Sequence, residues 1–150
     1  MDRNIIIVDN FIDGVEKISF KQVFDEVPKR ISQILNEKVE IKSFSTDKEV
    51  SRGVISDNNS RWTGVHFLDD PLSLNAKKLV LKFFSHKETG LEYCPNESIH
   101  EQYNVSNEIN LWNQYANIQS KYNKLVLFRS NLWHSFGNDL SVTFTIFRMQ

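Results

Sequence analysis

Residues 123–135 read Asn123-Lys124-Leu125-Val126-Leu127-Phe128-Arg129-Ser130-Asn131-Leu132-Trp133-His134-Ser135, and residues 141–148 read Ser141-Val142-Thr143-Phe144-Thr145-Ile146-Phe147-Arg148. The first stretch predicts an apolar strand over 123–129 that runs into a turn, and the second predicts a closing strand over 141–148. The turn places a single histidine, His134, just beyond the first strand. A histidine held at the rim of a small β-barrel is a candidate metal ligand.

The pattern of short strands extends back along most of the chain. Apolar runs or alternation of apolar with polar residues predict strands at 5–8, 39–44, 52–55, 62–68 and 78–84. Residues 85–121 are polar and irregular, so we expect a long excursion with one helical turn near Trp112.

Two helices are expected near the N-terminus. From Val15 to Phe24 the apolar residues recur at spacings of three and four, which is typical of a helix. Pro28 suits the first turn of a second helix that would bury Ile31 and Leu35. The sequence thus predicts one α+β, mainly β domain over 1–150, with a strand and helices in 1–38 and a barrel in 39–150.

The overall composition narrows the functional classes. The chain has 150 residues, of which 40% are hydrophobic and 25% charged, as in ordinary globular domains. Its net charge of −1 gives no broad basic surface, so we expect no nucleic-acid partner. A single cysteine, Cys94, allows no internal disulfide and is interpreted as a buried or inert thiol. No apolar run is long enough for a membrane span or signal peptide, which predicts a cytoplasmic protein.

Three segments in order resemble one family. Asn4-Ile5-Ile6-Ile7-Val8-Asp9-Asn10-Phe11-Ile12 is similar to the opening strand of prolyl-hydroxylase-like oxygenases, and Trp62-Thr63-Gly64-Val65-His66-Phe67-Leu68 to the strand after their first metal motif. Leu127-Phe128 before His134 resembles their distal-histidine strand pair. The chain therefore resembles the iron(II)/2-oxoglutarate oxygenase superfamily, near its small bacterial and phage branches. The resemblance implies a double-stranded β-helix, a jelly-roll or cupin-like barrel, with N-terminal helices on the sheet.

That resemblance implies a metal site and two cofactors, Fe(II) and 2-oxoglutarate, if the protein is active. The family holds iron with His-x-Asp/Glu from one strand end and a distal His from another, leaving open positions for 2-oxoglutarate and oxygen. On this pattern Asp57 is the carboxylate ligand and His134 the distal histidine. The first histidine of the motif should be residue 55, which is Ile55 and cannot bind a metal.

The expected 2-oxoglutarate contacts also depart from the family pattern. Phe67 stands where the family often has a tyrosine, and Leu140 or Ser141 where it has an arginine. Arg148 follows Leu140 by eight residues, or roughly 26 Å of extended strand, so we expect it to lie too far away to replace that arginine. His66 is the alternative third ligand, but strand alternation points it outward if Val65 and Phe67 face inward.

Each of the two candidate metal ligands also has a simpler interpretation. His134 alone suits a hydrogen-bonded rim histidine, and Asp57 before two asparagines suits a turn. The first functional hypothesis is a 2-oxoglutarate-dependent dioxygenase of hydroxylase type, acting on an unidentified small molecule or protein. The second is a catalytically inactive member of the fold that serves as a binding module or a structural piece of a larger assembly. An enzyme that uses another divalent metal is a third.

Overall fold

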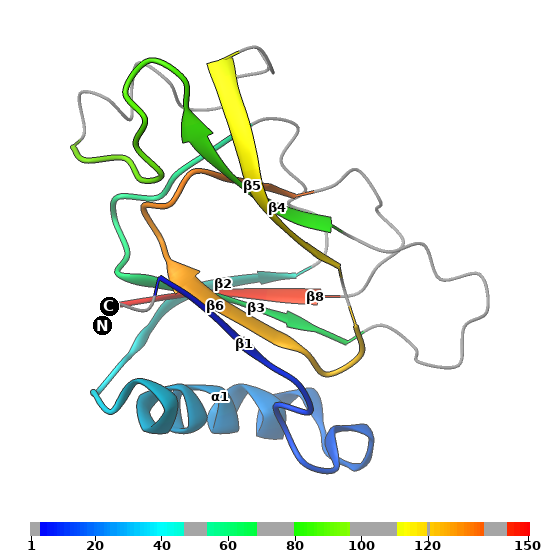
Figure 1. Cartoon of the computed structure of the whole chain (residues 1–150). Helices are drawn as coiled ribbons and strands as arrows, with labels where there is room; N and C mark the ends of the chain where they lie inside the picture. The colour runs from blue at the N-terminus through cyan, green and yellow to red at the C-terminus, as the bar shows by residue number, and fades with distance from the viewer. Residues whose placement is uncertain (1–3, 47–53, 69–79, 97–110, 120, 137–143) are drawn as a thin grey trace.

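The computed structural model describes residues 4–46, 54–68, 80–96, 111–119, 121–136 and 144–150. These residues form two antiparallel sheets and one α-helix, so the protein is mainly β. The helix lies against one face of the larger sheet, and the smaller sheet lies on the other side (Figure 1). The expected mainly β architecture is confirmed.

The larger sheet contains the strands predicted near both ends of the chain. Its order is β1 (Ile5–Val8), β6 (Leu125–Arg129), β3 (Trp62–Phe67), β8 (Phe144–Met149) and β2 (Ile41–Thr46). In the central pairings Thr63 lies opposite Phe128 on one side and Arg148 on the other. Arg148 in turn lies opposite Ser43 of β2. This row of residues crosses the sheet at one end of β3.

The smaller sheet has the order β5 (Trp112–Gln119), β4 (Val80–His86) and β7 (His134–Phe136). Phe83 of β4 lies opposite His134 of β7. An isolated bridge joins His134 to Ile55 on its other side. The sheet is thereby extended by a short segment at the place where the sequence predicts a strand over 52–55, of which residues 54 and 55 are described.

One helix replaces the two that the sequence predicted. A 3₁₀ turn spans Val15–Lys17, and α1 then runs without interruption over Phe20–Leu35 with Pro28 in its interior. Ser19 and Gln22 form a reciprocal capping box, which satisfies donors at the helix start. The expectation of a helix start at Pro28 is wrong because the cap and the long buried face of α1 outweigh the backbone hydrogen bond that proline removes.

The expected helical turn near Trp112 is also wrong. Trp112 begins β5, an eight-residue strand that pairs with β4 over its whole length. Within the described residues β5 is an edge strand, and most of its side chains after Trp112 are exposed. Polar side chains suit such an edge, and after Trp112 only Ala116 and Ile118 alternate with them toward the core, which is too short a pattern to predict the strand.

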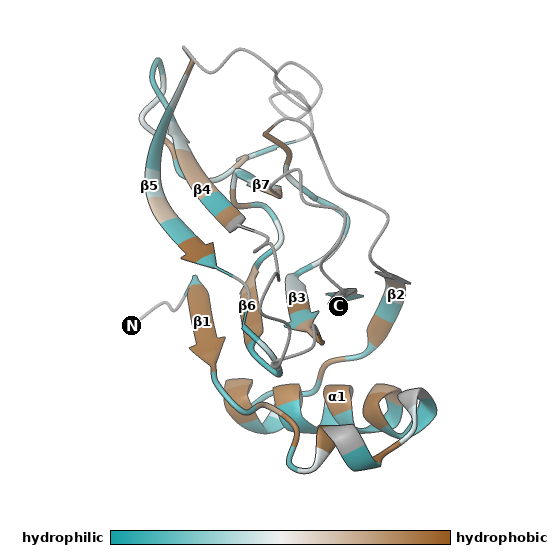
Figure 2. Ribbon diagram, turned by 90° about the vertical axis from the view of Figure 1, so that its right-hand side faces the viewer, coloured by the Kyte–Doolittle hydropathy of each residue, from teal (hydrophilic) through white to brown (hydrophobic). Residues whose placement is uncertain are grey.

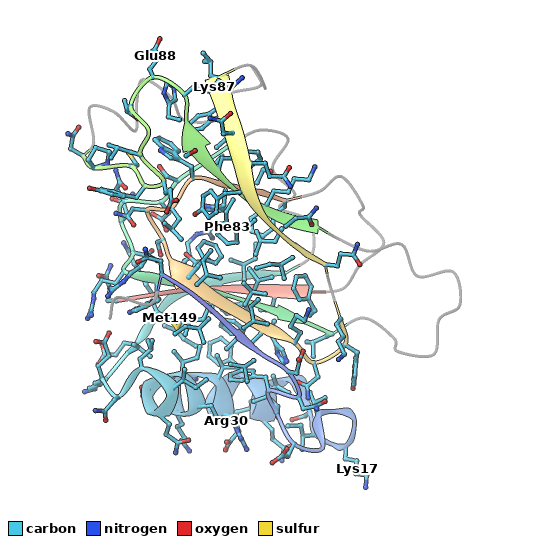
Figure 3. All side chains as sticks on the ribbon, viewed as in Figure 1. Lys17, Arg30, Phe83, Lys87, Glu88 and Met149 are labelled. Carbon is cyan, nitrogen blue, oxygen red and sulfur yellow. The ribbon has the colours of Figure 1, made fainter. Side chains whose placement is uncertain are left out.

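Two apolar layers hold the elements together. Figure 2 shows the hydrophobic stripe of α1 turned toward the larger sheet. In Figure 3, Met149 lies between α1 and this sheet, whereas Phe83 lies between the two sheets. Strand β3 serves both layers, because Trp62 packs on the helix side and Val65 and Phe67 pack on the other. No helix in the described part of the chain is long and apolar enough to span a bilayer.

Candidate functional site

A pocket of about 460 Å³ opens at one end of the layer between the sheets. Strands β2, β3, β7 and β8 and the segment 55–60 supply its walls. The ionisable side chains in the lining are Lys42, Asp57, His134 and Arg148. Two predicted metal ligands, Asp57 and His134, therefore share one pocket.

Ile55 and His134 are direct cross-strand neighbours. The Ile55 N–H donates to the His134 carbonyl at 2.8 Å, and the His134 N–H donates back to Ile55 at 2.9 Å. Residues paired in this way project their side chains to the same face of a sheet, with Cβ atoms about 5 Å apart. The Ile55 side chain thus stands beside the imidazole of His134.

His134 is buried in an aromatic enclosure. The rings of Phe128, Phe136 and Phe83 lie 4.8, 5.7 and 6.5 Å from its own ring centre. Burial, with a smaller contribution from the charge of Arg148, lowers the pKa of His134 to about 4, while the Leu132 carbonyl and the charge of Asp57 oppose the shift. The imidazole is neutral at physiological pH.

The tautomer of His134 follows from one hydrogen bond. Its Nδ1 lies 2.7 Å from the Leu132 carbonyl oxygen, which can only accept. Nδ1 therefore carries the proton in the neutral ring, and Nε2 carries the lone pair. The histidine offers a ligand atom or a hydrogen-bond acceptor at Nε2.

The Asp57 carboxylate is held by three donors. Its Oδ1 accepts from the Asn59 N–H at 2.9 Å, which closes a turn of the kind predicted from the asparagines that follow. Its Oδ2 accepts from the Ser60 hydroxyl at 2.8 Å and lies 3.5 Å from Nε of Arg148. Asp57 thus shapes the turn and also anchors a cation in the pocket.

Arg148 and Lys42 make the pocket more basic than the sequence suggested. Arg148 lies near the end of β8, opposite Thr63, and its side chain is about one quarter exposed. Lys42 lies in a bulged region of β2, and its Nζ donates to the Asn59 carbonyl at 2.8 Å. The expectation that Arg148 lies too far away is wrong, because the C-terminal part of the last strand, where Arg148 lies, reaches this end of β3.

The remaining predicted site residues lie elsewhere. Phe67 is fully buried in the layer between the sheets and does not line the pocket. Leu140 and Ser141 lie outside the described residues. His66 points away from Val65 and Phe67, as alternation predicted, but α1 and its preceding loop cover that face, so His66 is buried rather than exposed.

His66 belongs to a structural network around Asn123. Its Nε2 lies 2.9 Å from Oδ1 of Asn123, which also accepts from the Ile12 N–H, while the Asn123 amide donates to the Ile12 carbonyl at 2.8 Å. Burial lowers the pKa of His66, and the hydrogen bond to Asn123 opposes the shift. The ring also makes an edge contact with Phe11 at 5.3 Å. These contacts give His66 a packing role.

Sequence reasoning missed Lys42 and Asn123, and it considered Arg148 but placed it too far from the site. The positive φ of Asn123, 58°, has a recognisable signal, since asparagine next to the predicted strand at 123–129 is a common left-handed residue. Lys42 and Arg148 had no comparable signal, because basic residues on strands near a sheet edge are ordinary. Only the pairing of β2 with β8 brings them together.

The donor set does not fit a complete iron centre. Among the described residues no three His, Cys, Asp or Glu side chains are grouped to hold a metal ion. Asp57 and His134 give two donors, Ile55 fills the third corner, and a guanidinium lies beside the carboxylate. Arg148 would oppose a cation placed on Asp57. The pocket is better suited to a ligand with an anionic group.

No protein-family model matches the chain, and no curated protein or solved structure does either. The residues and their geometry are therefore the basis for a functional assignment.

Proposed function

We propose that the chain is a double-stranded β-helix protein of the oxygenase type whose pocket binds a small carboxylate-bearing molecule without catalytic iron. The order of segments supports this fold. Along the chain, β2, β3, β6 and β8 belong to the larger sheet, and Ile55, β4, β5 and β7 belong to the smaller one. With β1 added at the edge of the larger sheet, this distribution of segments over two facing sheets supports a jelly-roll arrangement.

The main support for the proposal is that the Asp57 carboxylate is already engaged by protein groups. Both of its oxygens are engaged by protein donors, and Arg148 supplies a positive charge beside the carboxylate that would have to hold the metal. Ile55 adds an aliphatic group next to His134. Each feature lowers metal affinity, and together they favour a binding module over an oxidising centre.

The lining chemistry indicates the ligand class. Arg148 and Lys42 suit a carboxylate, hydroxyl-bearing residues suit further polar groups, and Nε2 of neutral His134 suits a donor. Phe136 and Ile55 give the pocket an apolar side. A dicarboxylate such as 2-oxoglutarate is the first ligand to test, without metal.

Calorimetric titration with Mn(II), with anaerobic Fe(II) and with 2-oxoglutarate tests the proposal. We expect the native chain to bind 2-oxoglutarate without metal and to take up no stoichiometric metal ion. The Ile55→His variant should gain metal binding, because its imidazole would lie beside His134. Ile55→Leu is the matched control and should gain none. Tight metal binding to the native chain that Asp57→Ala and His134→Ala both abolish would overturn the proposal.

An active 2-oxoglutarate-dependent hydroxylase is the second candidate. It is favoured by the shared location of Asp57 and His134 in one pocket. In that case a third ligand must come from outside the described donor set. Succinate formation from 2-oxoglutarate with iron(II) and oxygen, absent in His134→Ala, would support this candidate.

A further inference from the structure

A second pocket of about 470 Å³ lies on the other side of the turn that follows Asp57. Ser60 lines both pockets, but the remaining walls of the second come from residues near the end of β6 and from the segment around Cys94. The side chains that matter below are Asn58, Arg61, Arg129 and Asn131. None of the described residues that line this pocket is acidic.

Arg129 is a cation of this pocket that has no acidic partner among the residues that the structure describes. Its guanidinium carbon lies 4.1 Å from the ring centre of Trp62, so the aromatic face fixes the group in place. Among the described residues no carboxylate pairs with Arg129. Trp62 is itself anchored, because its indole N–H donates to Glu37 at 3.1 Å. A stacked arginine without an acidic partner is prearranged for an external anion.

Arg61 supplies a second guanidinium at the same pocket. One of its nitrogens lies 2.6 Å from Glu37, which engages one end of the fork. A guanidinium carries five N–H donors, so donors remain after this pairing. The lining thus has two guanidinium groups against the single carboxylate of Glu37, which stands outside it.

Asn131 adds a neutral donor. Its backbone carbonyl accepts from the Cys94 N–H at 2.7 Å, which fixes the residue at the pocket wall. Its side-chain amide has no hydrogen-bond partner within the described part of the chain. A side-chain amide beside two guanidiniums is suited to an oxygen-rich anion.

Asn58 presents a hydrogen-bond acceptor to this site, whereas the residues above present donors. Its amide nitrogen donates to Sγ of Cys94 at 3.3 Å, and the Cys94 thiol donates onward to the Asn96 carbonyl at 3.2 Å, which sets the orientation of the Asn58 amide. Its Oδ1 is then buried without a hydrogen-bond partner among the described residues. A buried acceptor left in this state costs free energy, so a donor on a bound ligand would be favourable.

We propose that this second pocket binds a hydroxyl-bearing oxyanion, namely hydrogen phosphate. The anionic oxygens lie against Arg129, Arg61 and Asn131, and the P–OH group donates to Oδ1 of Asn58. This site is separate from the carboxylate pocket proposed above, so either can fail without the other.

Nuclear magnetic resonance titration of the full chain with inorganic phosphate and with sulfate at pH 7 tests the site. The two ions have the same shape and similar charge, but sulfate lacks a hydroxyl. We expect saturable shifts of the Trp62 indole and Asn131 amide signals with phosphate, and at least several-fold weaker binding of sulfate. Equal affinities, or no saturable shift with phosphate, would overturn the proposal.

Two matched variants locate the binding. Asn131→Asp changes one amide into a carboxylate of nearly the same size and should reduce phosphate affinity at least tenfold. Asn117→Asp makes the same charge change on the exposed edge strand β5 and should leave the affinity unchanged. Asn58→Ala should lower the affinity of the protein for phosphate to its affinity for sulfate. If Asn131→Asp and Asn117→Asp bind phosphate equally well, the ion is not in this pocket.

Discussion

Nε of Arg148 lies 3.5 Å from Oδ2 of Asp57, and this pair joins the end of the last strand to the turn that opens the candidate pocket. The two residues are ninety-one positions apart in sequence, and both are less than one third exposed. Since Ser60 and the Asn59 N–H hold the same carboxylate, the guanidinium is placed by a turn that the sequence did allow us to predict.

The Asp57→Ala variant should lower the free energy of unfolding by about 1–3 kcal/mol, because three donors lose their acceptor in a partly buried place. Asp9→Ala removes the same charge from an exposed ion pair with Lys121 and should cost less than about 1 kcal/mol. Chemical denaturation measures both. In a double-mutant cycle with Arg148→Met we expect a coupling of about 1 kcal/mol. Additive effects would mean that the ion pair contributes nothing.

Stability should fall between pH 7 and pH 5 because of His134. Its pKa is about 4 in the folded protein against about 6.5 when unfolded, so in this window the unfolded chain binds a proton that the folded chain does not. The contribution of neutral His134 to the free energy of unfolding is thus fully present above pH 6.5 and is lost as the pH falls toward 4. The loss from pH 7 to pH 5 is about 2 kcal/mol.

Denaturant titrations of the native chain and of His134→Gln at the two pH values check this. The variant cannot titrate at position 134, so its stability should depend less on pH, whatever its absolute stability. His66, whose pKa burial also lowers, acts with the same sign and remains in the variant. An identical pH dependence of the two proteins would contradict the burial of a neutral His134.

Asn123 should be the most sensitive polar residue outside the pocket. Asn123→Ala removes the acceptor of His66 and Ile12 and a donor to the Ile12 carbonyl, and it also strains a backbone with φ of 58°. We expect a loss of about 2–4 kcal/mol. Asn123→Gly accepts this φ without strain, so the difference between the two variants measures the backbone part. A more stable alanine variant would contradict this account.

Replacing Pro28 should stabilise the protein. Proline in the interior of α1 removes a backbone hydrogen bond to the preceding turn and crowds it, and Ala at this position restores the bond. We expect Pro28→Ala to raise the free energy of unfolding by about 1–3 kcal/mol, less the added entropy of the unfolded chain. Thermal unfolding followed by circular dichroism is a direct measurement. Lys29→Ala, one residue further on, is the control and should change little.

The amino-acid sequence determined the elements whose local pattern is strong. The apolar runs at 5–8, 62–68 and 123–129 are all strands of the larger sheet, because buried strands must alternate or be apolar throughout. The Asp57 turn was readable for a similar reason, since its side chain bonds to its own following backbone. These features depend on neighbours along the chain.

The features that the sequence left undetermined depend on partners far along the chain. Polar β5 is a strand because β4 provides backbone partners, and α1 passes through Pro28 because the larger sheet buries Val23, Val27 and Ile31. The pairing of β8 with β2 and β3 brings Arg148 to Asp57, and the bridge to β7 sets Ile55 beside His134. Local propensity decides which segments form strands, but only tertiary packing decides which side chains meet, because it sets the register and order of those strands.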